Sequence, residues 1–315
     1  MEKQFDVLVA GELNADLILD TLDCFPAIGK EVLAHNMTVT LGSSSAIFAC
    51  NLRTLGAGVA FSGMLGRDHF GAFIISELEK KGVDTRYITC SPEHHTGSTV
   101  VLNLGEVRAN ITYPGAMHHS TINQISEEAI HSSRHLHISS VFLQKRMKDD
   151  IVELLKKAKD AGLTTSLDPQ WDPDEQWDMD TSSLLPFVDI FIPNAAEFKA
   201  LTKTNDMAEA LRYIRQMDHV IVVKNGREGA YLRDGRDLQY QPAFLNQSVA
   251  DCIGAGDSFN AGFIYRFLQQ RSLSDCVEFG SLIGAVNTTQ TAGTAAFENI
   301  GGIKQIARNL FNYTF

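Results

Sequence analysis

The chain has 315 residues, a hydrophobic content of 44% and a formal net charge of −11. This length and composition, without a low-complexity tract, indicate a globular protein with one large α/β domain or with a core and a smaller attachment. Acidic residues outnumber basic residues by 38 to 27, and no basic cluster is longer than a triplet. Nucleic acid and anionic membrane surfaces are therefore poor partners.

The five cysteines are scattered, odd in number and free of any C-x-x-C pair. This usage favours a reduced, cytoplasmic setting. The N-terminus runs straight into an apolar strand, without a basic segment followed by a long apolar core. We therefore expect neither a signal peptide nor a membrane span.

Two β-rich segments stand out in the N-terminal third. The first predicted strand spans residues 5–10, a short apolar run that suits a buried parallel strand. Residues 12–40 are also strand-like, but they are too interrupted to form a βαβ unit. Residues 96–117 contain a predicted hairpin of residues 98–104 and 108–112. The segments 12–40 and 96–117 can form one small sheet, whose strand pairing the sequence leaves open.

The remainder of the chain alternates between predicted helices and predicted strands. Residues 42–56 begin with cap-like serines and continue as a predicted helix, and residues 66–82 form a predicted loop and amphipathic helix. Alternation from about residue 58 to 290 favours a mainly parallel sheet with helices on both faces, which places ligands at the carboxyl ends of the strands. The other predicted strands are 135–140, 163–167, 187–192 and 219–223, and the other predicted helices are 148–161 and 280–291.

The most informative stretch is Asp251-Cys-Ile-Gly-Ala-Gly-Asp257, which a helical apolar pattern follows at once. Two glycines let the backbone turn tightly, so that successive N–H groups point into one space at a helix N-terminus. Together with the helix macrodipole, these groups form a site for an anion, typically phosphate. Asp257 beside that site is a candidate general base toward a substrate hydroxyl. The alternative is that Asp257 only caps the helix.

Two further motifs suit a metal ion and a nucleotide. Asn194 and Glu197 share one face of a predicted helix, and two such oxygen ligands, often acting through water, suit Mg²⁺. The same spacing is a capping pattern, and both interpretations can hold at once. Lys224 ends a predicted strand before Gly226 and Gly229, where it can contact a nucleotide phosphate or remain a solvated lysine.

Residues 251–257 closely resemble the second signature of the PfkB family, the ribokinase-like carbohydrate kinases, written D-T-x-G-A-G-D; Cys252 replaces the Thr. In that family the glycine-rich turn stabilises the transferred phosphoryl group, and the final aspartate, here Asp257, deprotonates the acceptor alcohol. The resemblance therefore assigns the anion site to Gly254, Ala255 and Gly256.

The resemblance extends over essentially the whole chain. The N-x-x-E motif at Asn194 and Glu197 is credited with Mg²⁺ binding in the family, and the stretch from Lys224 to Gly229 is similar to its nucleotide-binding turn. Asp168, which ends a predicted strand, matches an acid that is common in these kinases and lies behind the residues that contact the ligands. Asp16 stands where the family has an aspartate that binds sugar hydroxyls; the alternative is a solvated loop acid.

The first family signature, typically G-G-x-x-A-N, is only partly present. Gly42 matches it, but the second Gly is Ser43, and the Asn that normally touches the sugar is Ile47. An apolar side chain cannot replace the hydrogen bonds of an amide, so we expect a sugar pocket that differs from that of a standard ribokinase. Ile47 instead suits a less polar substrate face, such as a nucleoside base. Asn51, one turn further on, lies about 6 Å along the helix axis and is not a dependable replacement.

Other residues near the expected sugar site are less specific. Arg108 and Lys30 are the basic candidates for binding a phosphorylated sugar. The pairs His94-His95 and His118-His119 flank the predicted hairpin and are interpreted as loop residues within reach of the sugar pocket. His135 and His137 share one strand face without a carboxylate or thiolate partner in register, so we expect no zinc site there.

The resemblance implies a ribokinase-like three-layer α/β/α fold with a mainly parallel sheet. Its core would comprise residues 1–11, 41–95 and 118–315, and residues 12–40 and 96–117 would form a β-sheet lid over the sugar. In many members that lid also forms a homodimer contact. The cofactors implied are ATP and Mg²⁺, and a monovalent cation is left open.

The expected activity is therefore ATP-dependent phosphorylation of a hydroxyl of a sugar or sugar-like substrate. A nucleoside kinase of the same family is one alternative. A non-catalytic sugar- or nucleotide-binding regulator on the same fold is another. A Rossmann oxidoreductase is disfavoured because no G-x-G-x-x-G joins the first strand to a helix.

Overall fold

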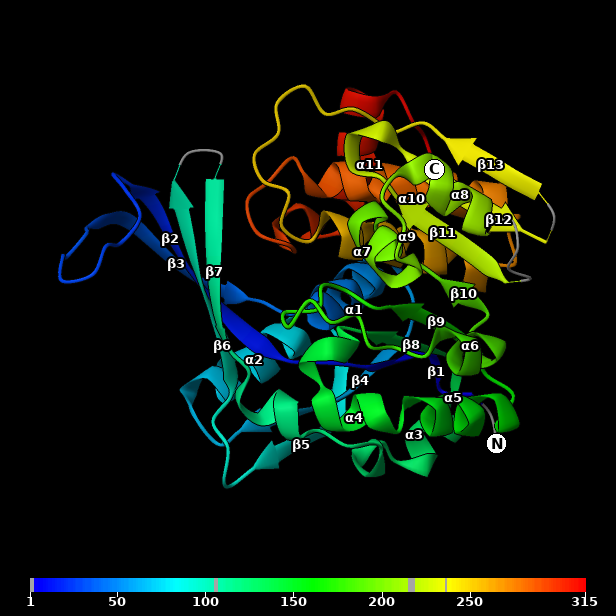
Figure 1. Cartoon of the computed structure of the whole chain (residues 1–315), viewed down its shortest axis with the longest axis horizontal. Helices are drawn as coiled ribbons and strands as arrows, with labels where there is room; N and C mark the ends of the chain where they lie inside the picture. The colour runs from blue at the N-terminus through cyan, green and yellow to red at the C-terminus, as the bar shows by residue number, and fades with distance from the viewer. Residues whose placement is uncertain (1–2, 105–106, 215–218, 236) are drawn as a thin grey trace.

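The computed structural model describes residues 3–104, 107–214, 219–235 and 237–315, which form two sheets (Figure 1). Within these residues the larger sheet has nine strands in the order β13-β12-β11-β10-β9-β8-β1-β4-β5. Pairing is parallel from β5 to β11, and β12 and β13 extend one edge in antiparallel fashion. The strands are β1 (Phe5–Ala10), β4 (Val59–Gly66), β5 (Asp84–Ser91), β8 (Ser133–Ser139), β9 (Thr164–Asp168), β10 (Ile190–Phe191), β11 (Val220–Lys224), β12 (Ala230–Asp234) and β13 (Asp237–Gln241).

Helices cover both faces of this sheet because its strands are apolar on both sides. In β1, Val7 and Val9 belong to one core, whereas Leu8 and Ala10 belong to the other. The first core is closed by α1 (Ser44–Leu55), α2 (His69–Lys80), α9 (Ala255–Leu268), α10 (Leu273–Asn287) and α11 (Ile300–Phe311). The second is closed by α3 (Glu127–His131), α4 (Lys145–Asp149), α5 (Ile151–Asp160), α6 (Thr181–Leu184), α7 (Ala195–Thr202) and α8 (Met207–Ile214). The predicted three-layer α/β/α fold is confirmed.

A separate four-stranded sheet, here called the small sheet, projects from one side of the main body (Figure 1). Its order is β3-β2-β6-β7, with a parallel β2–β6 pair between two antiparallel pairs. The predicted small sheet is therefore confirmed, and the structure supplies the pairing. The turn expected at Gly105-Glu106 lies outside the described residues. The strands are β2 (Asn14–Leu22), β3 (Ala34–Leu41), β6 (Gly97–Leu104) and β7 (Val107–Tyr113).

Three predicted elements differ in the structure. The single helix predicted over 148–161 is two helices, α4 and α5, because Asp150 at φ −107° and ψ 9° leaves the helical region. The strand predicted over 187–192 shrinks to β10, because a 3₁₀ turn over Leu185–Phe187 takes up its beginning. The helix predicted over 280–291 begins earlier, where the Ser272 hydroxyl accepts a hydrogen bond from the Asp275 amide, and ends at Asn287.

Two further observations concern the helices and the cysteines. Within the described ranges, none of the helices has the length and apolar character needed to cross a bilayer. All five cysteines carry free thiols.

Helices α9 and α10 approach closely because glycines line their contact. A Cβ on Gly262 would lie 2.8 Å from the Ile283 Cβ atom, and one on Gly280 would lie 2.9 Å from the Phe259 carbonyl oxygen. No side chain fits between the two helices at these points. Since α9 begins at the glycine-rich turn, this contact also fixes the position of that turn.

Gly262→Ala should destabilise the protein by about 1–3 kcal/mol, because the added methyl group forces α9 and α10 apart. Gly302→Ala is the matched control: in α11 its new Cβ would have no neighbour closer than 3.8 Å. Helix propensity alone should then stabilise this variant by about 0.5–1 kcal/mol. Urea unfolding of the two variants measures both effects, and equal stabilities would contradict the close contact at Gly262.

Candidate active site

The glycine-rich turn leads directly into α9. Its N-cap is Gly254, whose φ of 76° lies in the left-handed region that favours glycine. A Cβ at this position would lie 2.7 Å from the Gly293 Cα atom. Gly254 has no side chain to cap α9, and the Ala255 amide donates to the Cys252 carbonyl at 3.2 Å, so the amides of Gly256 and Asp257 are the ones that can meet an anion. Asp257 lies inside that first turn and does not cap the helix.

A buried polar network holds the turn from behind. The Asn51 amide donates to the Gly293 carbonyl and to the Ser258 hydroxyl, both at 2.9 Å. The Ser258 hydroxyl donates to Asn287 at 2.9 Å, and the Asn287 amide donates to the Ile253 carbonyl at 2.6 Å. The Asn51 side chain therefore helps to hold the turn, and it does not take the place of the sugar-binding Asn that Ile47 replaces.

Asp257 lies within a cluster of charged and amide groups. Lys224 forms a buried ion pair with Asp168 and donates to the Asn260 side-chain oxygen at 3.1 Å. The Asn260 amide also donates to Asp168, at 2.6 Å. The Gln170 amide bridges the two acids, lying 2.9 Å from Asp257 and 3.2 Å from Asp168. The ends of β9 and β11 and the start of α9 therefore meet at one point.

Burial controls the proton affinity of this cluster. Burial raises the pKa of Asp257 to about 7; Asp168 adds to the rise, and Lys224 opposes it. Burial and then Asp168 raise the pKa of Glu197 to about 8. Burial lowers the pKa of Lys224, but Asp168 and Glu197 raise it by more, so the amine stays charged. Asp257 consequently exchanges its proton near neutral pH, as a general base requires.

Asn194 and Glu197 form the capping box of α7. The Asn194 side-chain oxygen accepts from the amides of Ala196 and Glu197, each at 2.9 Å, and the Glu197 carboxyl accepts from the Asn194 amide at 2.8 Å. Within the described residues, no three His, Cys, Asp or Glu side chains are grouped as metal ligands. A cation at this point would therefore rely on water and on substrate oxygens, which is the usual state of Mg²⁺. Three carboxyl groups beside one lysine give such a cation a favourable field.

Asp16, Gly42 and Ser44 form a second group of residues near Asp257, apart from the group around Lys224. A Cβ on Gly42 would lie 2.2 Å from an Asp16 carboxylate oxygen, so that carboxylate lies directly over the glycine. Asp16 also accepts a hydrogen bond of 2.7 Å from Asn14. The Ser44 hydroxyl reaches Asp257, which joins the start of α1 to the start of α9. Gly42, beside Asp16, and Ser44, bonded to Asp257, are thus only two residues apart in the chain, although neither acid lines the large cavity described below.

The side chains of Ser43 and Ile47 point into the protein interior. The Ser43 hydroxyl donates to the Glu12 carbonyl at 2.6 Å and accepts from the Ala46 amide at 2.9 Å. Its φ of 69° explains why glycine is usual at this position. The Ile47 side chain is 3% exposed and packs against Gly254 and Gly293.

Arg108 and Lys30 are placed only by the backbone register and by exposure. The side chain of Arg108 lies outside the described part of the structure. In register, its backbone is opposite Asn103, four residues or about 13 Å along the sheet from the Thr112 position that aligns with Thr99 and Asp16. Lys30 lies in an exposed loop.

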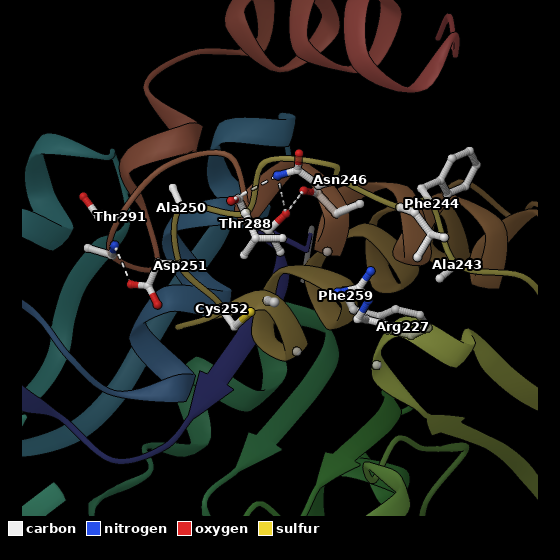
Figure 2. A pocket seen from close by; sticks show the side chains of 18 of the residues that line it. Arg227, Ala243, Phe244, Asn246, Ala250, Asp251, Cys252, Phe259, Thr288 and Thr291 are labelled. Carbon is white, nitrogen blue, oxygen red and sulfur yellow. Dashed lines mark hydrogen bonds between the residues drawn. The ribbon is translucent and has the colours of Figure 1, made fainter. Parts of the chain in front are cut away.

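A cavity of about 1030 Å³ opens in front of the turn. One wall contains Lys224, Gly226, Gly229, Ala255 and Gly256, and the opposite wall is the inner face of the small sheet. Figure 2 shows Cys252 at the start of α9 and the hydrogen bonds that tie Asn246 to Thr288 above it. Further lining comes from Ile18, Asp20, Thr38, Asn103, Phe244, Ser281, Gly284 and Ala285.

Sequence reasoning missed several residues of this site. Glu12 is 1% exposed and bonds the Ser45 amide at the start of α1, and burial raises its pKa. Gln170 and Asn260 contact the acids directly, and Ser258 belongs to the network behind the turn. The available signal was a polar residue inside an apolar pattern, as at Ser258 and Asn260 in α9.

Three comparisons relate the chain to known proteins. The family description "pfkB family carbohydrate kinase" matches residues 4–300. The 2-dehydro-3-deoxygluconokinase of Bacillus subtilis (strain 168) is 31% identical over 260 residues, which are 78% of this chain and 80% of that relative. Among solved structures, Arabidopsis thaliana ribokinase complexed with ribose and ATP has a TM-score of 0.82 at 22% identity, with 100% of both chains covered. Adenosine kinase from Sinorhizobium meliloti has a TM-score of 0.82 at 21% identity, covering 97% of this chain and 99% of that one.

Lys224→Met should lower the free energy of unfolding by about 3–5 kcal/mol, because it leaves Asp168 buried without its charge partner. Lys157→Met removes the same charge from an exposed pair with Glu153 and should cost only about 0.3–0.5 kcal/mol. Chemical unfolding at neutral pH compares the two. A similar small cost for both would mean that the Lys224 pair is dispensable.

Proposed function

The chain belongs to the PfkB family of carbohydrate kinases, and we propose that it transfers the terminal phosphoryl group of ATP to a hydroxyl of a sugar or sugar-like substrate. The observation that supports this most directly is the position of Asp257. It lies in the first turn of an uncapped helix and has a pKa of about 7. A base and an anion site therefore adjoin each other, which is what phosphoryl transfer to an alcohol requires.

Transfer would proceed in line across the turn. Asp257 takes the proton of the acceptor hydroxyl as its oxygen attacks the terminal phosphorus of ATP, the bond to the bridging oxygen breaks, and ADP leaves. The amides of residues 254–257 hold the oxygens of the transferring group, and Lys224 beside Gly256 adds positive charge. Protein residues thus position the reactants and stabilise charge, without forming a covalent intermediate.

Mg²⁺ belongs to the proposal as a partner of the phosphates. When bound, it neutralises charge on the oxygens of ATP. Asn194 and Glu197 would hold it through water, since their oxygens are already engaged in the capping box. Lys224, Gly226 and Gly229 line the cavity and would contact the nucleotide.

We propose that the acceptor lies between Asp16 and Asp257, over Gly42, with the small sheet as its cover. In this arrangement residues 12–40 and 96–117 form the lid, and 1–11, 41–95 and 118–315 form the core. Polar residues on the cavity side of the small sheet support this role. Ile47 lends no support to a nucleoside base, because its side chain packs behind the turn. A nucleoside acceptor remains the alternative that a substrate panel distinguishes.

The outer face of the small sheet supports a homodimer. Leu17, Val39, Val100 and Ile111 are aligned across all four strands, and they alternate with the residues that line the cavity. On this face Met37 is 66% exposed and Ile111 is 64% exposed. An apolar row of this kind is covered in most soluble proteins, and a second copy of the same sheet would cover it.

Activity assays should be run under reducing conditions. All five cysteines are free and Cys252 lines the cavity, which supports a cytoplasmic setting.

A monovalent cation is left open by the sequence, and assays with and without potassium show whether one takes part.

Asp257→Asn should reduce kcat by about 10²–10⁴-fold, since the amide cannot accept the proton. ATP binding, measured by calorimetry, should be nearly unchanged. The assay measures ATP consumption with Mg²⁺ against free sugars, sugar acids, sugar phosphates and nucleosides. In the native enzyme, kcat/KM should fall tenfold per pH unit below about pH 7, where Asp257 becomes protonated.

Asp160→Asn, at an exposed helix end, is the control and should retain full activity. Wild-type turnover by the Asp257 variant would refute the proposed base. If the native protein binds ATP but consumes none with any of the tested substrates, the result would favour the non-catalytic regulator instead.

Ile111→Glu should convert a dimer into a monomer, because it buries a charge in the centre of the apolar row. Leu310→Glu places the same change on α11, at a side chain that is 57% exposed, and should leave the mass unchanged. Analytical ultracentrifugation distinguishes the two. Equal masses for both variants would mean that the small sheet is not the interface.

A further inference from the structure

A second cleft, of about 440 Å³, lies where the small sheet joins the main body. It is formed by the ends of β4 and β5, the 3₁₀ helix η1 (Gly115–His119) and α4. None of its lining residues belongs to the larger cavity in front of the turn. The polar side chains that line it include Thr89, Ser91, His94, His119, Gln124 and Arg146, together with the carboxylate of Glu93.

Groups that can carry positive charge gather in this cleft. The rings of His94 and His119 are stacked, with centroids 3.6 Å apart and planes 6° apart, and His118 meets His119 edge-on at 5.8 Å. Within the described residues, neither stacked ring nor the Arg146 guanidinium has a hydrogen bond or an ion pair. Arg146 is nevertheless close enough to His119 to act on it electrostatically.

The groups around His119 disfavour a charge on its ring. Burial, then His94, Arg146 and His118, lower the pKa of His119, and only Glu93 opposes them. An anion in the cleft would reverse that balance, because it would favour protonation of both rings and would pair with Arg146.

The cleft also occupies a particular place in the chain. His94 shortly precedes β6, and His119 ends the helix that follows β7. Two walls of the cleft are therefore the segments that lead into β6 and out of β7. These segments are joined by a hydrogen bond of 2.7 Å from the Ala116 amide to the His95 carbonyl. Asp68 anchors them to the main body by accepting from the Thr96 amide and hydroxyl, both at 2.7 Å.

We propose that this cleft binds the phosphate group of a small molecule, held by the Arg146 guanidinium and the imidazoles of His94 and His119. A tetrahedral oxyanion offers acceptor oxygens to donors that converge from several directions, which suits a guanidinium fork beside two rings. The hydroxyls of Thr89 and Ser91 supply further donors. Because its walls are the connections to the small sheet, an occupied cleft restrains the base of that sheet.

Titration of the full-length protein with inorganic phosphate at constant ionic strength tests the site. Histidine ring protons, followed by NMR, should shift for His94 and His119 with a single saturating curve. Arg146→Gln and His119→Asn should each weaken this binding at least tenfold. Lys145→Gln is the matched control: it removes the same charge from the neighbouring exposed residue of α4, whose amine pairs with Asp174, and should bind normally.

Sulfate, whose charge is constant between pH 6 and 8, should bind more tightly at pH 6, where the rings are more readily protonated. Shifts that survive unchanged in Arg146→Gln, or that are equally lost in Lys145→Gln, would overturn the proposal. So would phosphate shifts confined to residues around Gly254 and Asp257. These readouts are independent of turnover, so they remain informative even if the proposed kinase activity fails.

Discussion

The structure depends most on how three buried carboxyl groups share one lysine. Asp168, Asp257 and Glu197 come from the end of a strand and the starts of two helices, and Lys224 is the cation that all three face. Burial first, and then the neighbouring Asp168, raise the pKa of the other two acids, and Lys224, which is paired directly with Asp168, only partly opposes that rise. A carboxyl group with a pKa of about 7 is therefore a consequence of the sheet bringing these elements together. The same group of acids supports the proposal that a phosphate donor binds here together with a cation.

The anion turn is rigid for a different reason. Its own sequence is rich in glycine and would be mobile in isolation. Asn51, Ser258 and Asn287 bond its carbonyl and that of Gly293 from behind, and each of these three side chains is fully buried. These buried bonds hold the backbone of the turn in place, which is the property that would make its remaining amides effective as preorganised donors.

Most of the fold was predictable, because it rests on local periodicity. The buried strands, the helix after Asp257 and the two β-rich segments of the small sheet all follow from the spacing of apolar residues. The family resemblance supplied the three-layer architecture and the expected roles of the motifs, whereas spacing alone gave only an anion site beside a carboxylate, and the strand order came from the structure. What could not be predicted are contacts between distant segments. Gln170 meets Asp257 across 87 positions, and Asn51 meets Ser258 across 207. Likewise, Ile47 looked like a change in the pocket, but only the packing of Gly293 reveals that it lies behind the turn.

The pairing of the small sheet has a consequence for how the chain folds. Its central pair, β2 with β6, joins distant parts of the chain: the Asn14 side chain in β2 bonds the Thr99 side chain in β6, 85 positions away. The intervening chain contains α1, β4, α2 and β5 of the main body. Closing so long a loop costs entropy that local contacts do not repay, so β2 and β6 gain little by meeting before the main body has formed. We therefore expect the small sheet to assemble after the main body. Its four strands are paired only with one another in the described residues, so the nine-stranded sheet keeps all of its own strand pairs without them.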